Sequence, residues 1–266
     1  LVIYLHFAMK RLLSCLGIVS LFTSAALVHA ASFRDVPNDS WFKPYTDYLV
    51  SQEIISNNPQ FFPFRTITRA ELAKMATNAG TKSDLLTTGG SDTQHFCDVT
   101  ASHWAASYIN ILAEVRIVNG TATSSCSLGK QFLPDQPITR AEAIKILLNL
   151  YHITPSGSAN FGDVDTSAWY SSYIAAAVQA GLVGGYNDGT FRPNNFLTRA
   201  EMSKVLVRAI DHQTGEDHGT STPQQTQAPT PTASSTPEPT SQPTTTASTS
   251  TTISAGAINI YALGDS

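Results

Sequence analysis

Three arginines stand in nearly identical five-residue segments, and arginine is a side chain that can hold an anion. A guanidinium is planar and donates paired hydrogen bonds to a carboxylate or a phosphate. We regard the three as candidates for ligand contact, with an internal ion pair to a nearby carboxylate as the alternative. The segments are residues 67–71, 138–142 and 197–201, and their arginines are Arg69, Arg140 and Arg199.

Each of these segments predicts the start of a helix. A threonine stands three positions ahead of a glutamate, and apolar residues at helical spacing follow, which is the capping-box pattern. The glutamate suits the positive end of the helix dipole, whereas the arginine needs an anionic partner there. The predicted caps are Thr68 with Glu71, Thr139 with Glu142, and Thr198 with Glu201.

The residues ahead of each box also recur, so the chain contains three repeats. Each begins with Phe-x-Asp-Val, has a tryptophan six residues after the aspartate, and has a tyrosine four residues later on the same helical face. This spacing predicts a first helix of 12 to 15 residues near each tryptophan, capped by the polar residues before it. Gly80 is expected to end the second helix of the first repeat. The aspartates are Asp35, Asp98 and Asp163, and the tryptophans are Trp41, Trp104 and Trp169.

A helix-turn-helix unit of about 50 residues cannot bury its apolar stripe alone, so the three units must pack together. We therefore expect one mainly α-helical domain with repeats at residues 33–80, 96–152 and 161–211. Tryptophan usually buries most of its area, and core packing is the interpretation that we favour for all three tryptophans.

These motifs, with the Gly-Tyr-x-Asp-Gly-Thr-Phe-x-Pro turn at residues 185–193, resemble the S-layer homology family. The resemblance implies a pseudo-threefold helical domain at the cell surface or wall. It also implies non-covalent binding of a cell-wall polysaccharide, either a pyruvylated secondary polymer or a peptidoglycan-linked glycan. The ligand grooves would lie between repeats, with Asp35, Asp98 and Asp163 supporting the loops. The residues assigned to these grooves are Arg69, Arg140, Arg199, Trp41, Trp104 and Trp169.

Physical chemistry agrees with that assignment. A guanidinium beside the free amides of a helix start can grip a carboxylate, and an indole face can stack on a sugar ring. The repeats are not identical, however. The family's glycine between the helices is present as Gly181 but replaced by Glu53 and Arg116, and residues 121–130 are an insertion. Three equal binding sites are therefore not expected.

The N-terminal region predicts export. Residues 9–30 combine Lys10 and Arg11, an apolar run and a small-residue cleavage site, which together are typical of a secretory signal peptide. A lipobox at Cys15 comes too early in the apolar run to be favoured. Loss of Cys15 leaves Cys97 and Cys126, which in an exported chain favour a disulfide over two free thiols.

Composition excludes other classes of function. The net charge is −4 with 14% charged residues, so the chain has no basic field for nucleic acid. No stretch after the signal is long and apolar enough for a membrane span. The histidines show no metal-ligand spacing, and we expect no metal and no cofactor.

The C-terminal region changes character twice. Residues 214–252 are rich in serine, threonine and proline, which predicts a disordered linker. Residues 253–266 then predict the start of a truncated domain, and the strand-like segment ending in Gly264-Asp265-Ser266 resembles the first block of GDSL (SGNH) hydrolases. In that family Ser266 would be the nucleophile. The given chain lacks the base and orienting groups, so it should be inactive.

The sequence therefore predicts a secreted protein whose three repeats hold the cell wall while the linker presents a cargo domain. Two alternatives remain open. One is a wall-anchored GDSL-type esterase or lipase, and the other is a structural subunit of an S-layer lattice.

Overall fold

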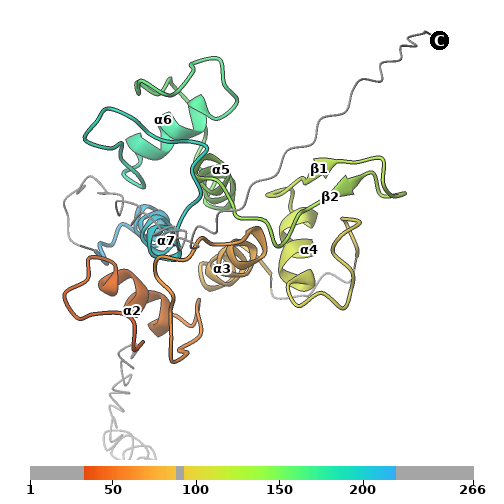
Figure 1. Cartoon of the computed structure of the whole chain (residues 1–266), viewed down its shortest axis with the longest axis horizontal. Helices are drawn as coiled ribbons and strands as arrows, with labels where there is room; N and C mark the ends of the chain where they lie inside the picture. The colour runs from red at the N-terminus through yellow and green to blue at the C-terminus, as the bar shows by residue number, and fades with distance from the viewer. Residues whose placement is uncertain (1–32, 88–92, 220–266) are drawn as a thin grey trace, which may run out of the picture. The chain divides into compact units, whose positions relative to one another are not determined.

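Six helices and one short hairpin make up the described part of the chain, residues 33–87 and 93–219 of a computed structural model (Figure 1). The predicted signal peptide and the predicted domain from residue 253 lie outside these residues. The helices are α2 (Lys43–Ser51), α3 (Arg69–Lys82), α4 (Ala106–Glu114), α5 (Arg140–Leu150), α6 (Ser171–Gln179) and α7 (Arg199–Thr214). The strands β1 (Thr121–Ala122) and β2 (Lys130–Gln131) pair antiparallel at the two ends of the predicted insertion.

The helices form an inner group of three and an outer group of three (Figure 1). The inner helices α3, α5 and α7 begin at the capping boxes and contact one another. Each outer helix packs against the inner helix of the preceding repeat: α4 against α3, α6 against α5, and α2 against α7. The last pairing joins the third repeat to the first, which closes the ring. The prediction of a pseudo-threefold, mainly helical domain is confirmed.

A ring of backbone hydrogen bonds marks the centre of this symmetry. The N–H of Ile67 donates to the carbonyl of Leu197 at 2.9 Å, that of Leu197 to Ile138 at 3.3 Å, and that of Ile138 back to Ile67 at 3.1 Å. All three side chains are fully buried. Each repeat therefore contributes one residue to a shared core, and no repeat completes the centre alone.

The box residues cap the inner helices as their pattern indicates. The hydroxyl of Thr139 accepts from the Glu142 N–H at 3.3 Å, and the Glu142 carboxylate accepts from the Thr139 N–H at 3.0 Å. Both partners of this reciprocal pair are also present at Thr68 with Glu71 and at Thr198 with Glu201. Two N–H groups that the helix itself cannot satisfy are thus bonded at each start.

Replacement Thr139→Ala should lower the free energy of unfolding by about 1 kcal/mol, because it removes the acceptor for the Glu142 N–H. Thermal or urea unfolding followed by circular dichroism measures this. Thr166→Ala, at an exposed threonine in the loop between α5 and α6, is the control and should change stability by less than about 0.5 kcal/mol. Equal melting of both variants would contradict the capping role.

Two local predictions were wrong. The first helices have nine residues each, start two residues after the tryptophans, and have no side-chain cap. The reason is a tight turn ahead of each helix, as where the Lys43 N–H donates to the Ser40 carbonyl. Gly80 does not end α3, which continues to Lys82. A Cβ at Gly80 would lie 2.7 Å from Leu86 Cδ1, so close packing explains the glycine.

The described residues also extend past the predicted start of the linker. Helix α7 ends at Thr214, with Gly215 in the left-handed conformation at its end. His218 then stacks on Tyr48 of α2 at 4.0 Å between ring centroids and contacts Asp211 at 2.6 Å.

Cys97 and Cys126 are joined by a disulfide, with their Cα atoms 6.1 Å apart, so the inserted loop is tied to the start of its repeat.

Candidate functional site

The predicted arginines lie where one repeat meets the next. Arg69 Nε donates to the Phe132 carbonyl at 2.7 Å, and its Nη1 lies 3.0 Å from the Glu142 carboxylate. Arg199 makes the same two contacts with Phe61 and Glu71, at 2.8 and 3.3 Å. Each arginine thus bridges its own repeat to the box glutamate of the next, so the internal ion pair considered from the sequence is present in both cases.

The backbone amides beside these arginines are not free, contrary to the expectation from the sequence. The N–H groups of Arg69 and Ala70 donate to the carbonyls of Gln136 and Pro134, both at 2.9 Å. The other two inner helices are bonded to their neighbouring repeats in the same way. Any anion in these places must therefore be held by side chains and not by a helix start.

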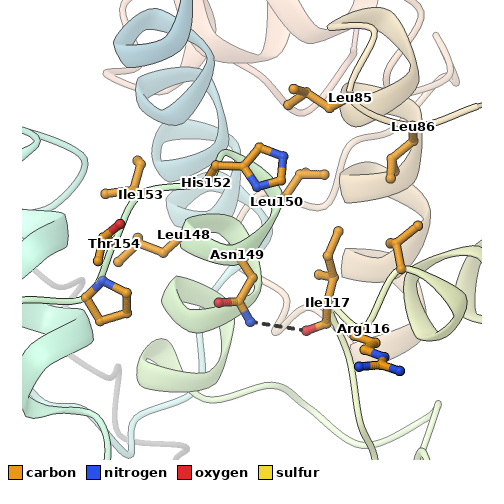
Figure 2. A pocket seen from close by; sticks show the side chains of 12 residues that line it. Leu85, Leu86, Arg116, Ile117, Leu148, Asn149, Leu150, His152, Ile153 and Thr154 are labelled. Carbon is orange, nitrogen blue, oxygen red and sulfur yellow. Dashed lines mark hydrogen bonds between the residues drawn. The ribbon is translucent and has the colours of Figure 1, made fainter.

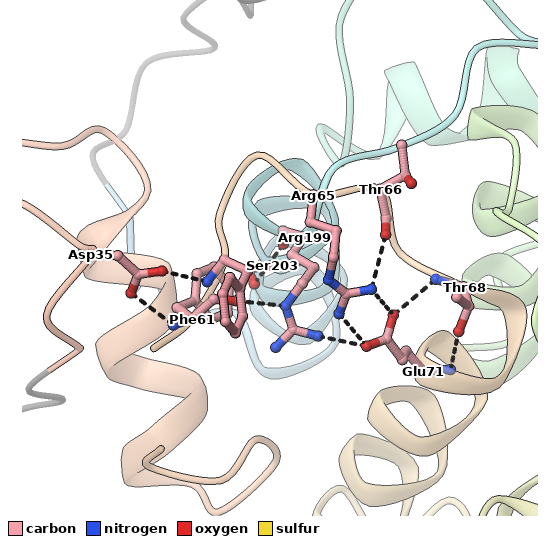
Figure 3. A network of polar contacts seen from close by, with 9 residues as sticks. Asp35, Phe61, Arg65, Thr66, Thr68, Glu71, Arg199 and Ser203 are labelled. Atoms are coloured by element: carbon pink, nitrogen blue, oxygen red, sulfur yellow. Dashed lines mark hydrogen bonds and ion pairs between the residues drawn. The ribbon is translucent and has the colours of Figure 1, made fainter. Parts of the chain in front are cut away.

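The repeated aspartates hold the loops that carry the arginine partners. Asp35 accepts from the N–H groups of Phe61 and Phe62, both at 2.7 Å, and Figure 3 shows its carboxylate directed at Phe61. Phe62 has a left-handed φ of 57°. Two charge-assisted hydrogen bonds stabilise this backbone conformation, which is costly for a bulky residue. The equivalents are Asp98 with Phe132 and Leu133, and Asp163 with Phe191 and Arg192.

The tryptophans are exposed, so the prediction that they pack in the core was wrong. Trp41, Trp104 and Trp169 are 42%, 54% and 51% exposed. Each tryptophan stands two residues ahead of an outer helix, in the turn that precedes it. The residues that the outer helix contributes to the core come later, within the helix itself. An exposed indole at the same place in three repeats is a surface suited to contact with a ligand.

Two equivalent grooves bring these residues together. The repeat 1 groove has a volume of about 290 Å³ and combines Arg199, Glu71 and Lys74 with Trp104 at its edge. All three repeats therefore contribute to it. Lys74 follows the box glutamate by three residues, and this recurrence in every repeat is a sequence signal that the initial site prediction missed.

The repeat 2 groove brings together the equivalent arginine, glutamate, lysine and tryptophan one repeat further along. Arg69, Glu142, Lys145 and Trp169 line a volume of about 160 Å³. The Lys145 ammonium lies 5.1 Å from the Trp169 ring centroid, a cation–π distance. Basic side chains outnumber the carboxylate in both grooves, although the whole chain carries a net charge of −4. Both grooves are thus locally attractive to an anion.

The third equivalent place is different. Arg140 is only 3% exposed, and its Nη2 donates to the Gly184 carbonyl at 2.8 Å. Its guanidinium carbon lies 4.6 Å from the Phe191 ring and 5.5 Å from the Tyr186 ring. Burial lowers the pKa of Arg140, with the carboxylate of Glu201 opposing that effect. The glycine turn of the third repeat thus covers Arg140, whereas the side chains of Arg69 and Arg199 line open grooves and are 13% and 19% exposed.

A larger pocket lies elsewhere. It has a volume of about 450 Å³, is lined largely by apolar residues, and is crossed by a hydrogen bond from Asn149 Nδ2 to the Ile117 carbonyl at 3.4 Å (Figure 2). It contains none of the predicted site residues.

Residues 33–87 and 93–219 hold no cluster of three or more metal-ligating side chains and no helix that could span a membrane. Ser266 lies outside these ranges.

Three helical repeats that close on one another, each with an exposed indole at the same place, define a class of protein, a cyclic repeat domain. The profile of the S-layer homology domain matches residues 32–73, 95–144 and 160–203, and the chain belongs to this family. The family places the chain outside the cell, at the cell surface or wall, as an anchoring protein.

Similar proteins include both surface-layer proteins and enzymes. The chain is 36% identical over 110 residues to the surface-layer 125 kDa protein of Lysinibacillus sphaericus, covering 41% of this chain and 9% of that one. It is 33% identical over 115 residues to the S-layer protein sap of Bacillus anthracis, covering 43% and 13%. It is 27% identical over 192 residues to exoglucanase XynX of Acetivibrio thermocellus, covering 69% and 16%. The chain therefore spans a small part of each of these relatives.

Proposed function

We propose that the chain attaches non-covalently to a cell-wall polysaccharide through the repeat 1 and repeat 2 grooves. The observation that carries this proposal is the recurrence of one constellation at two repeat junctions: a bridging arginine, a lysine on the inner helix and an exposed tryptophan. Indole faces stack on sugar rings, and the basic side chains attract an anionic group on the polymer. The ligand would be a polymer with acidic sugar units, such as a pyruvylated secondary polymer or a peptidoglycan-linked glycan.

The site residues of this proposal are Arg69, Arg199, Trp104 and Trp169. Arg140 is covered, and Trp41 lies at the same junction, so we do not assign them to ligand contact. Because the similar proteins named above are S-layer proteins and an exoglucanase, the anchor is compatible with different cargoes. A GDSL-type hydrolase that starts near Ser266 and a lattice-forming region both stay predictions.

Sedimentation with purified cell-wall sacculi tests the proposal. The chain should co-sediment with native sacculi, and mild acid extraction of their secondary polymer should abolish sedimentation. The basic side chains of the grooves attract the anionic polymer electrostatically, and dissolved salt screens this attraction. Binding should therefore also weaken as salt rises, for example between about 50 mM and about 500 mM NaCl. Binding to neither preparation would reject polysaccharide anchoring, and equal binding to both would reject an acidic secondary polymer as the ligand.

A further inference from the structure

One loop position distinguishes the repeat 1 groove from its counterparts. This position lies three residues before the capping threonine. Its backbone carbonyl accepts a hydrogen bond from the N–H of the box arginine of a neighbouring repeat, so the three residues are structurally equivalent. The pairs are Arg65 with Arg199, Gln136 with Arg69, and Asn195 with Arg140, at 2.9, 2.9 and 2.8 Å. Only the first repeat places a charged side chain there.

The Arg65 side chain is directed at the box glutamate (Figure 3). Its Nη1 donates to Glu71 Oε2 at 3.1 Å, and its Nη2 donates to Oε1. Arg199 Nη1 reaches the same Oε1 at 3.3 Å, so two guanidinium groups converge on one carboxylate. Burial alone would raise the pKa of Glu71, but hydrogen bonds from Arg65 and the Thr68 N–H, with the charges of both arginines, hold it below its usual value.

The repeat 2 groove has no such second cation. Glu142 pairs there with Arg69 at 3.0 Å, and the neutral Gln136 cannot neutralise a carboxylate. Three basic side chains face one carboxylate in the repeat 1 groove, a net charge of +2, whereas two face one in the repeat 2 groove, a net charge of +1. The difference between the two grooves is the charge of Arg65.

We propose that Arg65 sets the anion affinity of the repeat 1 groove and makes it the stronger of the two wall-binding grooves. Arg65 neutralises Glu71, so the charge of Arg199 remains for an anionic sugar unit of the polymer. Arg199 Nη2 takes no part in the contacts to Phe61 and Glu71 and is the donor that this ligand would use. Arg65 acts through Glu71 and is therefore a positioning residue.

The aromatic residues of the groove support the same assignment. Phe62 and Trp104 both line it and are 49% and 54% exposed. The equivalents of Phe62 are Leu133 and Arg192, so an exposed ring at this position belongs to the first repeat alone. An acidic sugar in the repeat 1 groove thus has two ring faces as well as the larger positive charge.

This inference rests on the proposed wall binding, and single-groove variants of the full chain test it. Trp169→Ala disables the repeat 2 groove and leaves the repeat 1 groove for measurement with native sacculi. Adding Arg65→Gln should weaken binding about tenfold and flatten its salt dependence, while Arg65→Lys should restore most of both. In the reciprocal background Trp104→Ala, the exchange Gln136→Arg should strengthen binding and steepen its salt dependence.

The outcomes separate this inference from the proposal beneath it. Failure of the unmutated chain to bind native sacculi would reject the proposed function itself. If that chain binds but Arg65→Gln leaves affinity and salt dependence unchanged, the role of Arg65 is wrong. The gain expected from Gln136→Arg does not depend on the stability of the Arg65 variants, so a Gln136→Arg chain that binds no better also overturns the inference.

Discussion

Replacing Trp104 and Trp169 together with alanine is expected to abolish sedimentation with native sacculi and to leave the fold intact. Each indole borders one of the two open grooves and is about half exposed. Aromatic residues of this kind contribute about 2 kcal/mol or more each to an interface, which corresponds to roughly thirtyfold in affinity per site. Because the side chains are exposed, their removal should change the free energy of unfolding by less than about 0.5 kcal/mol.

The matched control for this double variant is Trp41→Ala. Trp41 occupies the same place in its repeat and is 42% exposed, but its ring lies 5.7 Å from the Lys204 ammonium on α7, the helix whose Glu201 acts on the covered Arg140. Binding isotherms should therefore show no loss for Trp41→Ala and a large loss for the double variant, with equal melting temperatures. Similar losses in both would mean that the third junction also binds the wall. Full binding by the double variant would remove the tryptophans from the site.

Replacement Ile138→Ala is expected to be the most destabilising of these substitutions, by about 2–5 kcal/mol. Ile138 is fully buried and belongs to the central ring with Ile67 and Leu197, so the cavity would open where all three repeats meet. Since the inner helices pack on one another around this point, we expect one cooperative transition at lower denaturant and not the loss of a single repeat.

The graded control is Ile138→Val, which removes one methylene and should cost about 0.5–1.5 kcal/mol. Urea unfolding monitored by circular dichroism and by tryptophan fluorescence would show whether the two probes coincide. Separate transitions, or equal stability of the alanine variant and the unmutated chain, would show that the repeats fold independently and that the central ring does not couple them.

The sequence determined the local structure of the repeats. A capping box involves residues three positions apart, so its hydrogen bonds depend on the nearest neighbours in the chain, and the starts of α3, α5 and α7 could be predicted from Thr and Glu alone. The repetition of these boxes also predicted a helical domain of three units. The first helices were predicted too long because the turns ahead of them are held by backbone contacts, which side-chain identity does not reveal.

Only the tertiary structure decided which arginine of one repeat pairs with which glutamate of another. Each of the three equivalent arginines had three equivalent glutamates to pair with, and the cyclic packing of outer helices on the preceding repeat assigned Arg69 to Glu142 and Arg199 to Glu71. The same packing exposed the tryptophans and buried Arg140 beneath the glycine turn. These contacts join residues far apart in the chain. Because the three repeats have nearly the same local sequence, that sequence does not predict which arginine pairs with which glutamate.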